Sequence, residues 1–171
     1  NKKSLSVNLK SREGKEIFHK LAAKSDIILE SFRPGVTTRL GIDYEQIKAV
    51  KPDIIYCSLS GYGQSNPNSL KALHDINMQA QSGYLSLNRG KTSPLHLCDL
   101  ASGMVAAQAM LAALYQRSVS GRGNYIDISM FDSFVWWNSM LDSRYYFYGG
   151  SLEAKDLEYP AVCYNIYDTK D

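Results

Sequence analysis

The chain of 171 residues has few cysteines and no cysteine motif. Its three cysteines, Cys57, Cys98 and Cys163, are odd in number and form no Cys-x-x-Cys pair, which argues against a disulfide framework and against a zinc site. Cys57 and Cys98 lie in apolar segments, so we expect small buried thiols in a reducing cytoplasm. A His-Glu-x-x-His motif and a Gly-x-Ser-x-Gly elbow are also absent. We therefore expect no metal, and neither a metalloenzyme nor a serine hydrolase.

Charge and long apolar runs are limited as well. The net charge is only +2, and the lysines and arginines are scattered, which argues against a nucleic-acid partner. No run of 18 uncharged apolar residues occurs, so no membrane span is expected. The composition, with 44% hydrophobic and 21% charged residues, is that of a globular protein. The chain starts in a strand-like stretch without a Met, and we expect it to be a piece of a longer protein.

Short apolar runs alternate with helical patterns in the first part of the chain. Residues 26–32 and 53–61 read as continuous apolar strands, and residues 4–9 alternate in polarity as a half-buried strand does. A helical pattern follows Ser11, a plausible N-cap. A second one covers residues 43–50, in which Asp43 and Gln46 are spaced like a capping box. Buried strands separated by helices predict one α/β domain, with a parallel sheet that helices cover on both faces.

The second part of the chain is richer in helical patterns. We expect a short helix over residues 75–83, a long one over 99–118, a strand over 125–130 and an aromatic-rich helix over 131–150. The first two helices each begin with an aspartate of the N-cap type. The aromatic side chains favour a buried or subunit-facing stripe over a cofactor site. Residues after about 150 are interpreted as a linker.

Asp99 and His74 are the candidate acid–base residues. Asp99 stands where an apolar segment meets the predicted long helix; a helix N-terminus favours a charged carboxylate, but an ordinary N-cap is the alternative. A lone histidine such as His74 is more often structural, although its ordinary pKa suits proton transfer near neutrality. In open α/β sheets, helix starts gather at the carboxyl ends of the strands. His74 and Asp99 could therefore face each other across a substrate carbon.

Two further segments suggest ligand contacts. Arg33 and Arg39 flank a Pro-Gly turn and could bind phosphates or simply be solvated surface residues. Residues 60–69 form a Gly-, Ser- and Asn-rich loop after a predicted strand, which suits the edge of a ligand cleft. This loop is neither Gly-x-Gly-x-x-Gly nor a Walker loop, so it predicts no nucleotide site.

Several segments, taken in order, resemble the family III CoA-transferase (CaiB/BaiF) superfamily, and most closely its α-methylacyl-CoA racemase branch. They are "NKKSLSVNLKSREGKEIF", "DIILESFRPGVTTRLGIDYEQI", "PDIIYCSLSGYGQ", "HDIN", "CDLASGMVAAQAMLAALYQR" and "SGRGNYIDISMFD". The resemblance implies a Rossmann-like CoA-binding large domain over residues 1–150, with its N-terminal portion missing. It also implies a linker and the start of a small domain over residues 151–171, and a homodimer with interlocked chains. The 171-residue piece alone is therefore expected to be inactive.

The resemblance also assigns roles to residues. In the transferases, the aspartate that matches Asp99 attacks the acyl-CoA thioester, whereas in the racemases it is one of two acid–base groups. The second such group is the histidine that matches His74. The CoA-contacting arginine matches Arg39. Other CoA-lining positions match Val7, Lys10, Phe32, Asp75 and Met130, with Arg33 close to this set.

Two neighbours of His74 depart from the racemase pattern. Leu73 stands where a glycine is usual, and Met78 where a tyrosine is frequent. The resemblance therefore implies an acyl-CoA enzyme, and we expect a 2-methylacyl-CoA racemase or epimerase. The alternatives are a CoA-transferase, in which His74 only lines the pocket, and a non-catalytic CoA-binding subunit. Coenzyme A is expected as part of the substrate, with no tightly bound cofactor.

Overall fold

The computed structural model describes residues 2–150 and 167–169. The linker and small-domain start predicted over residues 151–171 therefore lie, apart from 167–169, outside the described residues. The elements are α1 (Arg12–Ala22), β1 (Ile27–Glu30), α2 (Val36–Leu40), α3 (Tyr44–Val50), β2 (Ile55–Ser60), α4 (Asp75–Gln81), α5 (Tyr84–Leu87), α6 (Leu97–Ser120), β3 (Asn124–Ser129), α7 (Met130–Trp137) and α8 (Ser139–Phe147).

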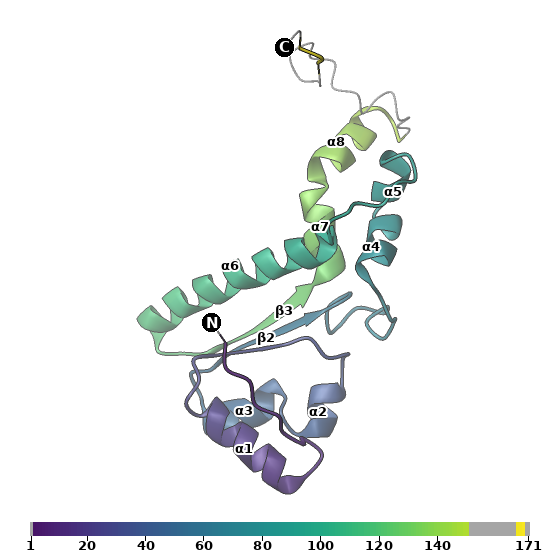
Figure 1. Cartoon of the computed structure of the whole chain (residues 1–171). Helices are drawn as coiled ribbons and strands as arrows, with labels where there is room; N and C mark the ends of the chain where they lie inside the picture. The colour runs from purple at the N-terminus through teal and green to yellow at the C-terminus, as the bar shows by residue number, and fades with distance from the viewer. Residues whose placement is uncertain (1, 151–166, 170–171) are drawn as a thin grey trace.

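The three strands form one parallel sheet in the order β1-β2-β3, which confirms the predicted fold class. Figure 1 shows α1 and α3 on one side of this sheet and α6 on the other. Successive side chains of β2 point to opposite faces of the sheet, as they do in any β-strand. Tyr56 packs in a cluster with residues of α1 and α3, whereas Cys57 packs with Ala106 of α6. Both faces are thus covered by apolar helix surfaces.

Local sequence signals place several helix starts correctly. The Ser11 side chain accepts a hydrogen bond from the Gly14 N–H at the start of α1. The Asp43 carboxylate accepts one from the Gln46 N–H at the start of α3. These contacts satisfy N–H groups that have no partner inside their own helix.

The prediction of a strand over residues 4–9 is wrong. This part of the described chain is irregular and leads into α1, where the Asn8 carbonyl accepts a hydrogen bond from the Ser11 N–H at 3.1 Å. An alternating pattern becomes a strand only where a neighbouring strand completes the ladder of backbone hydrogen bonds, and no strand of the described sheet pairs with this segment.

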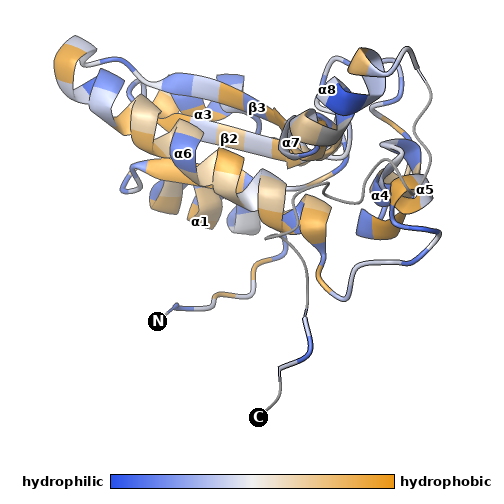
Figure 2. Cartoon of the chain, turned by 90° about the horizontal axis from the view of Figure 1, so that it is seen from above, coloured by the Kyte–Doolittle hydropathy of each residue, from blue (hydrophilic) through white to orange (hydrophobic). Residues whose placement is uncertain are grey.

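The helix α6 crosses the sheet and buries one side against it. Its buried residues include Ala101 and Ala106, while Leu100, Met104, Leu111, Tyr115 and Val119 are exposed. In Figure 2 apolar segments run along α6 as it is seen from above. Among the described helices, α6 alone is long and apolar enough to cross a membrane by length and composition, and core helices of soluble proteins also pass that test.

Arg117, in the last turn of α6, ties this helix to the beginnings of two strands. Its guanidinium donates hydrogen bonds to the Asp26 carboxylate at 2.8 Å, and to the carbonyls of Asp26 and Asp53 at 3.3 and 3.2 Å. Asp26 immediately precedes β1, and Asp53 lies just before β2. The contact fixes the carboxyl end of α6 at the edge of the sheet where the strands begin.

We expect Gly123→Ala to destabilise the protein by about 1–3 kcal/mol, because overpacking forces the backbone to shift. A Cβ at Gly123 would lie 2.1 Å from the Ile54 carbonyl oxygen. The measurement is urea denaturation of the full-length protein. Gly103→Ala is the matched control: its Cβ would meet nothing within 4 Å, and it should raise stability by about 0.5–1 kcal/mol. Equal urea midpoints for Gly123→Ala and wild type would contradict this packing.

Candidate active site

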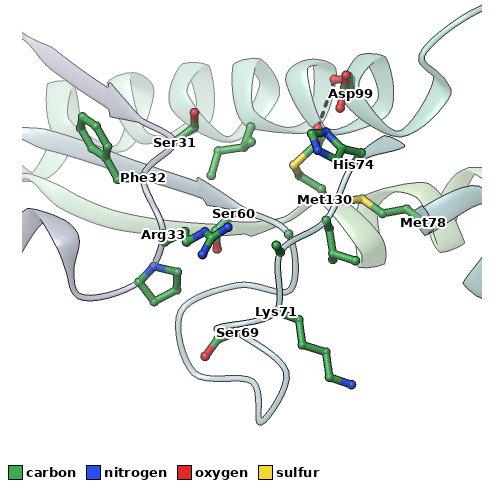
Figure 3. Close-up of a pocket in the computed structure, with 16 residues that line it drawn as sticks. Ser31, Phe32, Arg33, Ser60, Ser69, Lys71, His74, Met78, Asp99 and Met130 are labelled. Carbon is green, nitrogen blue, oxygen red and sulfur yellow. Dashed lines mark hydrogen bonds between the residues drawn. The ribbon is translucent and has the colours of Figure 1, made fainter. Parts of the chain in front are cut away.

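A cavity of about 420 Å³ opens where the three strands end. Its walls come from the segment after β1 (residues 31–34), from the end of β2 and the residue after it (residues 59–61), and from Met130, which follows β3. His74 and Asp99, at the starts of α4 and α6, also line it (Figure 3). Open parallel sheets bind their ligands at this edge, where strands end and helices begin.

His74 and Asp99 lie in the same part of the cavity (Figure 3). His74 is the N-cap residue of α4, its backbone N–H donates to the Asn77 side-chain oxygen at 3.1 Å, and the residue is exposed. Asp99 is in the first turn of α6, and its side chain is 52% exposed. Both groups can therefore reach a molecule in the cavity.

The interpretation of Asp99 as an ordinary N-cap is wrong. The helix α6 begins at Leu97, two residues before Asp99, and His96 is its N-cap residue. The first N–H groups of α6 are instead capped from another helix. The Asp75 carboxylate accepts hydrogen bonds from the Cys98 N–H at 2.7 Å and from the Asp99 N–H at 3.3 Å. Asp99 is thereby free to face the cavity.

Asp75 itself does not cap its own helix, contrary to the sequence-based expectation. It is the first residue of α4 and only 7% exposed. Its second carboxylate oxygen accepts a hydrogen bond from the Gln79 side-chain amide. A buried charge of this kind is tolerated because N–H donors surround it.

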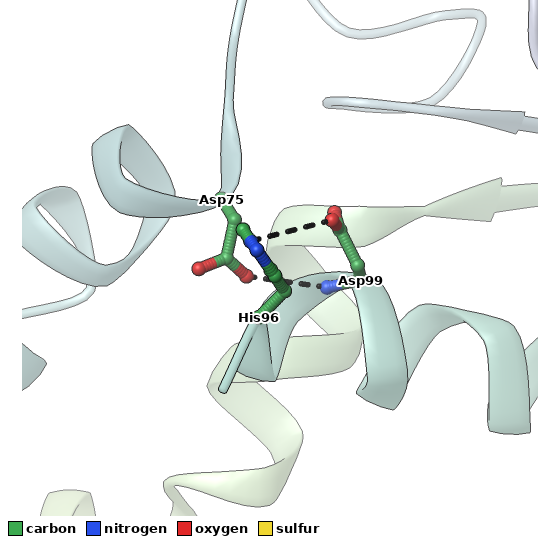
Figure 4. Close-up of side chains that lie close together, drawn as sticks. All are labelled: Asp75, His96 and Asp99. Carbon is green, nitrogen blue, oxygen red and sulfur yellow. Dashed lines mark hydrogen bonds and ion pairs between the residues drawn. The ribbon is translucent and has the colours of Figure 1, made fainter. Parts of the chain in front are cut away.

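His96 brings a second imidazole close to Asp99. Its Nδ1 lies 4.0 Å from Asp99 Oδ2, and Figure 4 shows Asp75, His96 and Asp99 together. Among the described residues, these three place potential metal-ligand atoms within 4.8 Å of one another. The hydrogen bonds of Asp75 to the start of α6 already account for its position, so the cluster gives no reason to infer a metal.

The predicted CoA-lining residues divide into three groups. Phe32, Arg33 and Met130 line the cavity. Val7, Lys10 and Arg39 do not: the first two lie in the irregular segment before α1, and Arg39 is exposed in the last turn of α2. Asp75 lines a smaller adjoining cavity of about 310 Å³ together with His74, His96 and Asp99.

Sequence reasoning missed one basic residue of the site. Lys71 lines the main cavity with Arg33, and Figure 3 shows both away from Asp99. Lys71 lies in the irregular connection between β2 and α4, where no periodic pattern indicates which way a side chain points. Its position just before the "HDIN" segment was the available signal.

The cysteine beside Asp99 is chemically quiet. Burial, with a further contribution from the Asp75 charge, raises the pKa of the Cys98 thiol to about 12. Burial likewise raises the pKa of Cys57 to about 11. Both thiols are fully buried, which confirms the expected burial of these two residues; Cys163 lies outside the described residues. A protonated, buried thiol is neither a nucleophile nor a metal ligand at neutral pH.

We therefore predict that iodoacetamide at pH 8 labels neither Cys57 nor Cys98 in the native full-length protein. A raised pKa keeps each thiol protonated until the pH approaches its folded value, about 11 for Cys57 and about 12 for Cys98. Peptide mass spectrometry measures the labelling, and the urea-unfolded protein, in which both should react, is the control. Equally fast labelling of Cys98 in native and unfolded protein would contradict this prediction and make Cys98 a candidate nucleophile.

Comparison with known proteins identifies the family. The family described as CoA-transferase family III matches residues 1–171, and the chain belongs to it. Human succinyl-CoA:glutarate CoA-transferase is 36% identical over all of this chain and 40% of its own length. Mouse α-methylacyl-CoA racemase is 36% identical over 82% of this chain and 38% of its own length. The chain thus spans about 40% of the length of these relatives.

Solved structures agree with the sequence matches. A CaiB/BaiF family protein from Brucella suis superposes with a TM-score of 0.84 at 28% identity, covering 88% of this chain and 41% of that one. The protein Rv3272 from Mycobacterium tuberculosis gives a TM-score of 0.77 at 32% identity, covering 84% and 41%. The CaiB/BaiF resemblance of the sequence segments is therefore confirmed.

Proposed function

We propose that the full-length protein is a racemase or epimerase of 2-methylacyl-CoA thioesters. The observation that carries this proposal is the shared cavity of His74 and Asp99, two exposed acid–base groups from the starts of different helices. Inversion at an α-carbon needs two such groups, because one removes a proton and the other delivers one to the opposite face.

The proposed reaction moves one proton at each side of the α-carbon. The thioester carbonyl acidifies the α-hydrogen, and either His74 or Asp99 removes it. The electron pair of the C–H bond forms a C=C bond while the π pair of the carbonyl moves onto its oxygen, which gives an enolate. The other group then donates a proton to the opposite face, and the thioester re-forms with inverted configuration.

The rest of the cavity suits the CoA part of such a substrate. Arg33 and Lys71 supply positive charge for the CoA phosphates. Phe32 and Met130 supply apolar contact area. Coenzyme A enters this proposal as part of the substrate. Val7, Lys10 and Arg39, outside the cavity, would meet only portions of CoA that extend beyond it.

A CoA-transferase is the second candidate function. Human succinyl-CoA:glutarate CoA-transferase and Acetobacter aceti acetyl-CoA:oxalate CoA-transferase are both similar to this chain, at 36% and 37% identity. The half-exposed Asp99 carboxylate suits a nucleophile. It would attack the thioester carbonyl, form an acyl–aspartyl anhydride and release CoA as the thiolate, and His74 would only line the pocket.

Deuterium incorporation separates the two reactions. With (S)-2-methylacyl-CoA in deuterated water, we expect the full-length protein to replace the α-hydrogen by deuterium and to invert the centre, because enolate formation exposes the α-carbon to exchangeable protons. Proton NMR follows both changes. A parallel reaction contains the acyl-CoA and a free carboxylic acid. The racemase proposal is wrong if the α-hydrogen persists while CoA moves to the acid and Asp99 forms a hydroxylamine-sensitive adduct.

His74→Ala should lower the rate of α-exchange by about 10²- to 10⁴-fold, the usual contribution of a positioned acid–base group. The matched control is His19→Ala. His19 hydrogen-bonds the Gly41 carbonyl at 2.9 Å, from α1, and lies outside the cavity, so its removal should leave the exchange rate of the folded protein unchanged. If His74→Ala exchanges the α-hydrogen at the wild-type rate, His74 takes no part in the mechanism.

A further inference from the structure

Asp75 is joined to both candidate acid–base residues. It follows His74 directly in the chain, and its carboxylate accepts hydrogen bonds from the backbone N–H groups of Cys98 and Asp99. One residue thus connects the start of α4 to the start of α6. The link to His74 is covalent, and the link to Asp99 is a charge-assisted hydrogen bond, a strong class of contact in a buried setting.

Neighbouring groups hold the Asp75 carboxylate in this orientation. Gln79, one helical turn later and 1% exposed, donates to Asp75 through its side-chain amide. The Gln79 side-chain oxygen in turn accepts the Ser93 N–H at 3.4 Å, from the segment before α6. The Cys98 thiol donates to the Asp75 carbonyl at 3.6 Å. The two helix starts are therefore connected by several polar contacts that all involve Asp75 or its partner Gln79.

A buried apolar cluster lies next to these hydrogen bonds and shares Cys98 with them. Met78 of α4 packs with Cys98, Ala101 and Phe134 in one buried cluster. Apolar contacts hold the helices together but do not depend on direction. They therefore fix the relative position of two helices less tightly than hydrogen bonds do. The hydrogen bonds of Asp75 are directional, and they act at the first turn of α6, the turn that carries Asp99.

We propose that Asp75 is a positioning residue, whose carboxylate sets where Asp99 stands relative to His74. Its carboxylate oxygens are directed to the start of α6 and to Gln79, so the role differs from a CoA contact. The inference rests on the proposed function in requiring that Asp99 and His74 act on one substrate. Catalytic groups need this control because a displacement of about 1 Å can cost about 10²-fold in rate.

Two substitutions in the full-length protein test the proposal. Asp75→Ala removes the acceptor for the Cys98 and Asp99 N–H groups, and should lower kcat for α-exchange by about 10²-fold while KM for the acyl-CoA changes by less than about threefold. Asp75→Asn keeps one side-chain oxygen for these N–H groups, and Gln79 can turn its amide to accept from the new NH₂ group, giving up its 3.4 Å contact with the Ser93 N–H. It should recover kcat to within about tenfold of wild type.

Asp43→Ala is the matched control. Asp43 is also a helix-capping carboxylate, which accepts the Gln46 N–H at 3.1 Å at the start of its own helix α3, but it lies outside the cavity. Its loss should leave kcat unchanged. Wild-type kcat in Asp75→Ala would overturn the proposal, and so would a rise in KM with unchanged kcat, because that pattern marks a substrate contact.

Amide hydrogen exchange gives a readout that needs no activity. At the Cys98 and Asp99 amides, exchange in Asp75→Asn should stay close to wild type, and in folded Asp75→Ala it should be faster by about tenfold or more. Unchanged protection in Asp75→Ala, or lost protection in Asp75→Asn, overturns the proposal. If the wild-type protein transfers CoA without α-exchange, the racemase proposal is wrong but the proposal for Asp75 is not. The same Asp75 variants are then tested by their kcat for CoA transfer through Asp99.

Discussion

The start of α6 depends on a carboxylate that another helix supplies. Asp75 accepts the N–H groups of Cys98 and Asp99, which an isolated helix would leave without a partner. At the other end of α6, Arg117 binds groups that precede β1 and β2. A helix fixed at both ends has little freedom to slide over the sheet, so the position of Asp99 follows from contacts far apart in the sequence.

The parallel sheet explains why so many separate segments meet at one cavity. Strands that run in one direction end at one edge, and the chain must leave each strand there and return through a helix. The segments after β1, β2 and β3 consequently surround the same space. At the opposite edge the same topology brings Gly123 against the Ile54 carbonyl, where only a glycine fits. The parallel sheet therefore accounts both for the close packing where the strands begin and for the cavity where they end.

Local patterns predicted what local interactions decide. The apolar runs gave β1 and β2, and the caps at Ser11 and Asp43 follow from side chains that reach three residues ahead. The roles of Asp75 and Lys71 were not predictable in this way. Asp75 acts across 23 residues of sequence to reach Cys98, and a one-dimensional pattern contains no sign of which helix a buried carboxylate will cap. The site residues were recognised from a family resemblance, and their arrangement only from the fold.

The two proposed reactions use the same carboxylate. In each of them Asp99, at the start of α6, would face a thioester, and the chemistry differs in whether it takes a proton from the α-carbon or attacks the carbonyl. Overall similarity does not choose between them, since the human transferase and the mouse racemase are each 36% identical to this chain. The choice depends on what stands opposite Asp99. In this protein an exposed imidazole, His74, shares the cavity, and proton transfer is the chemistry to which an imidazole adds most.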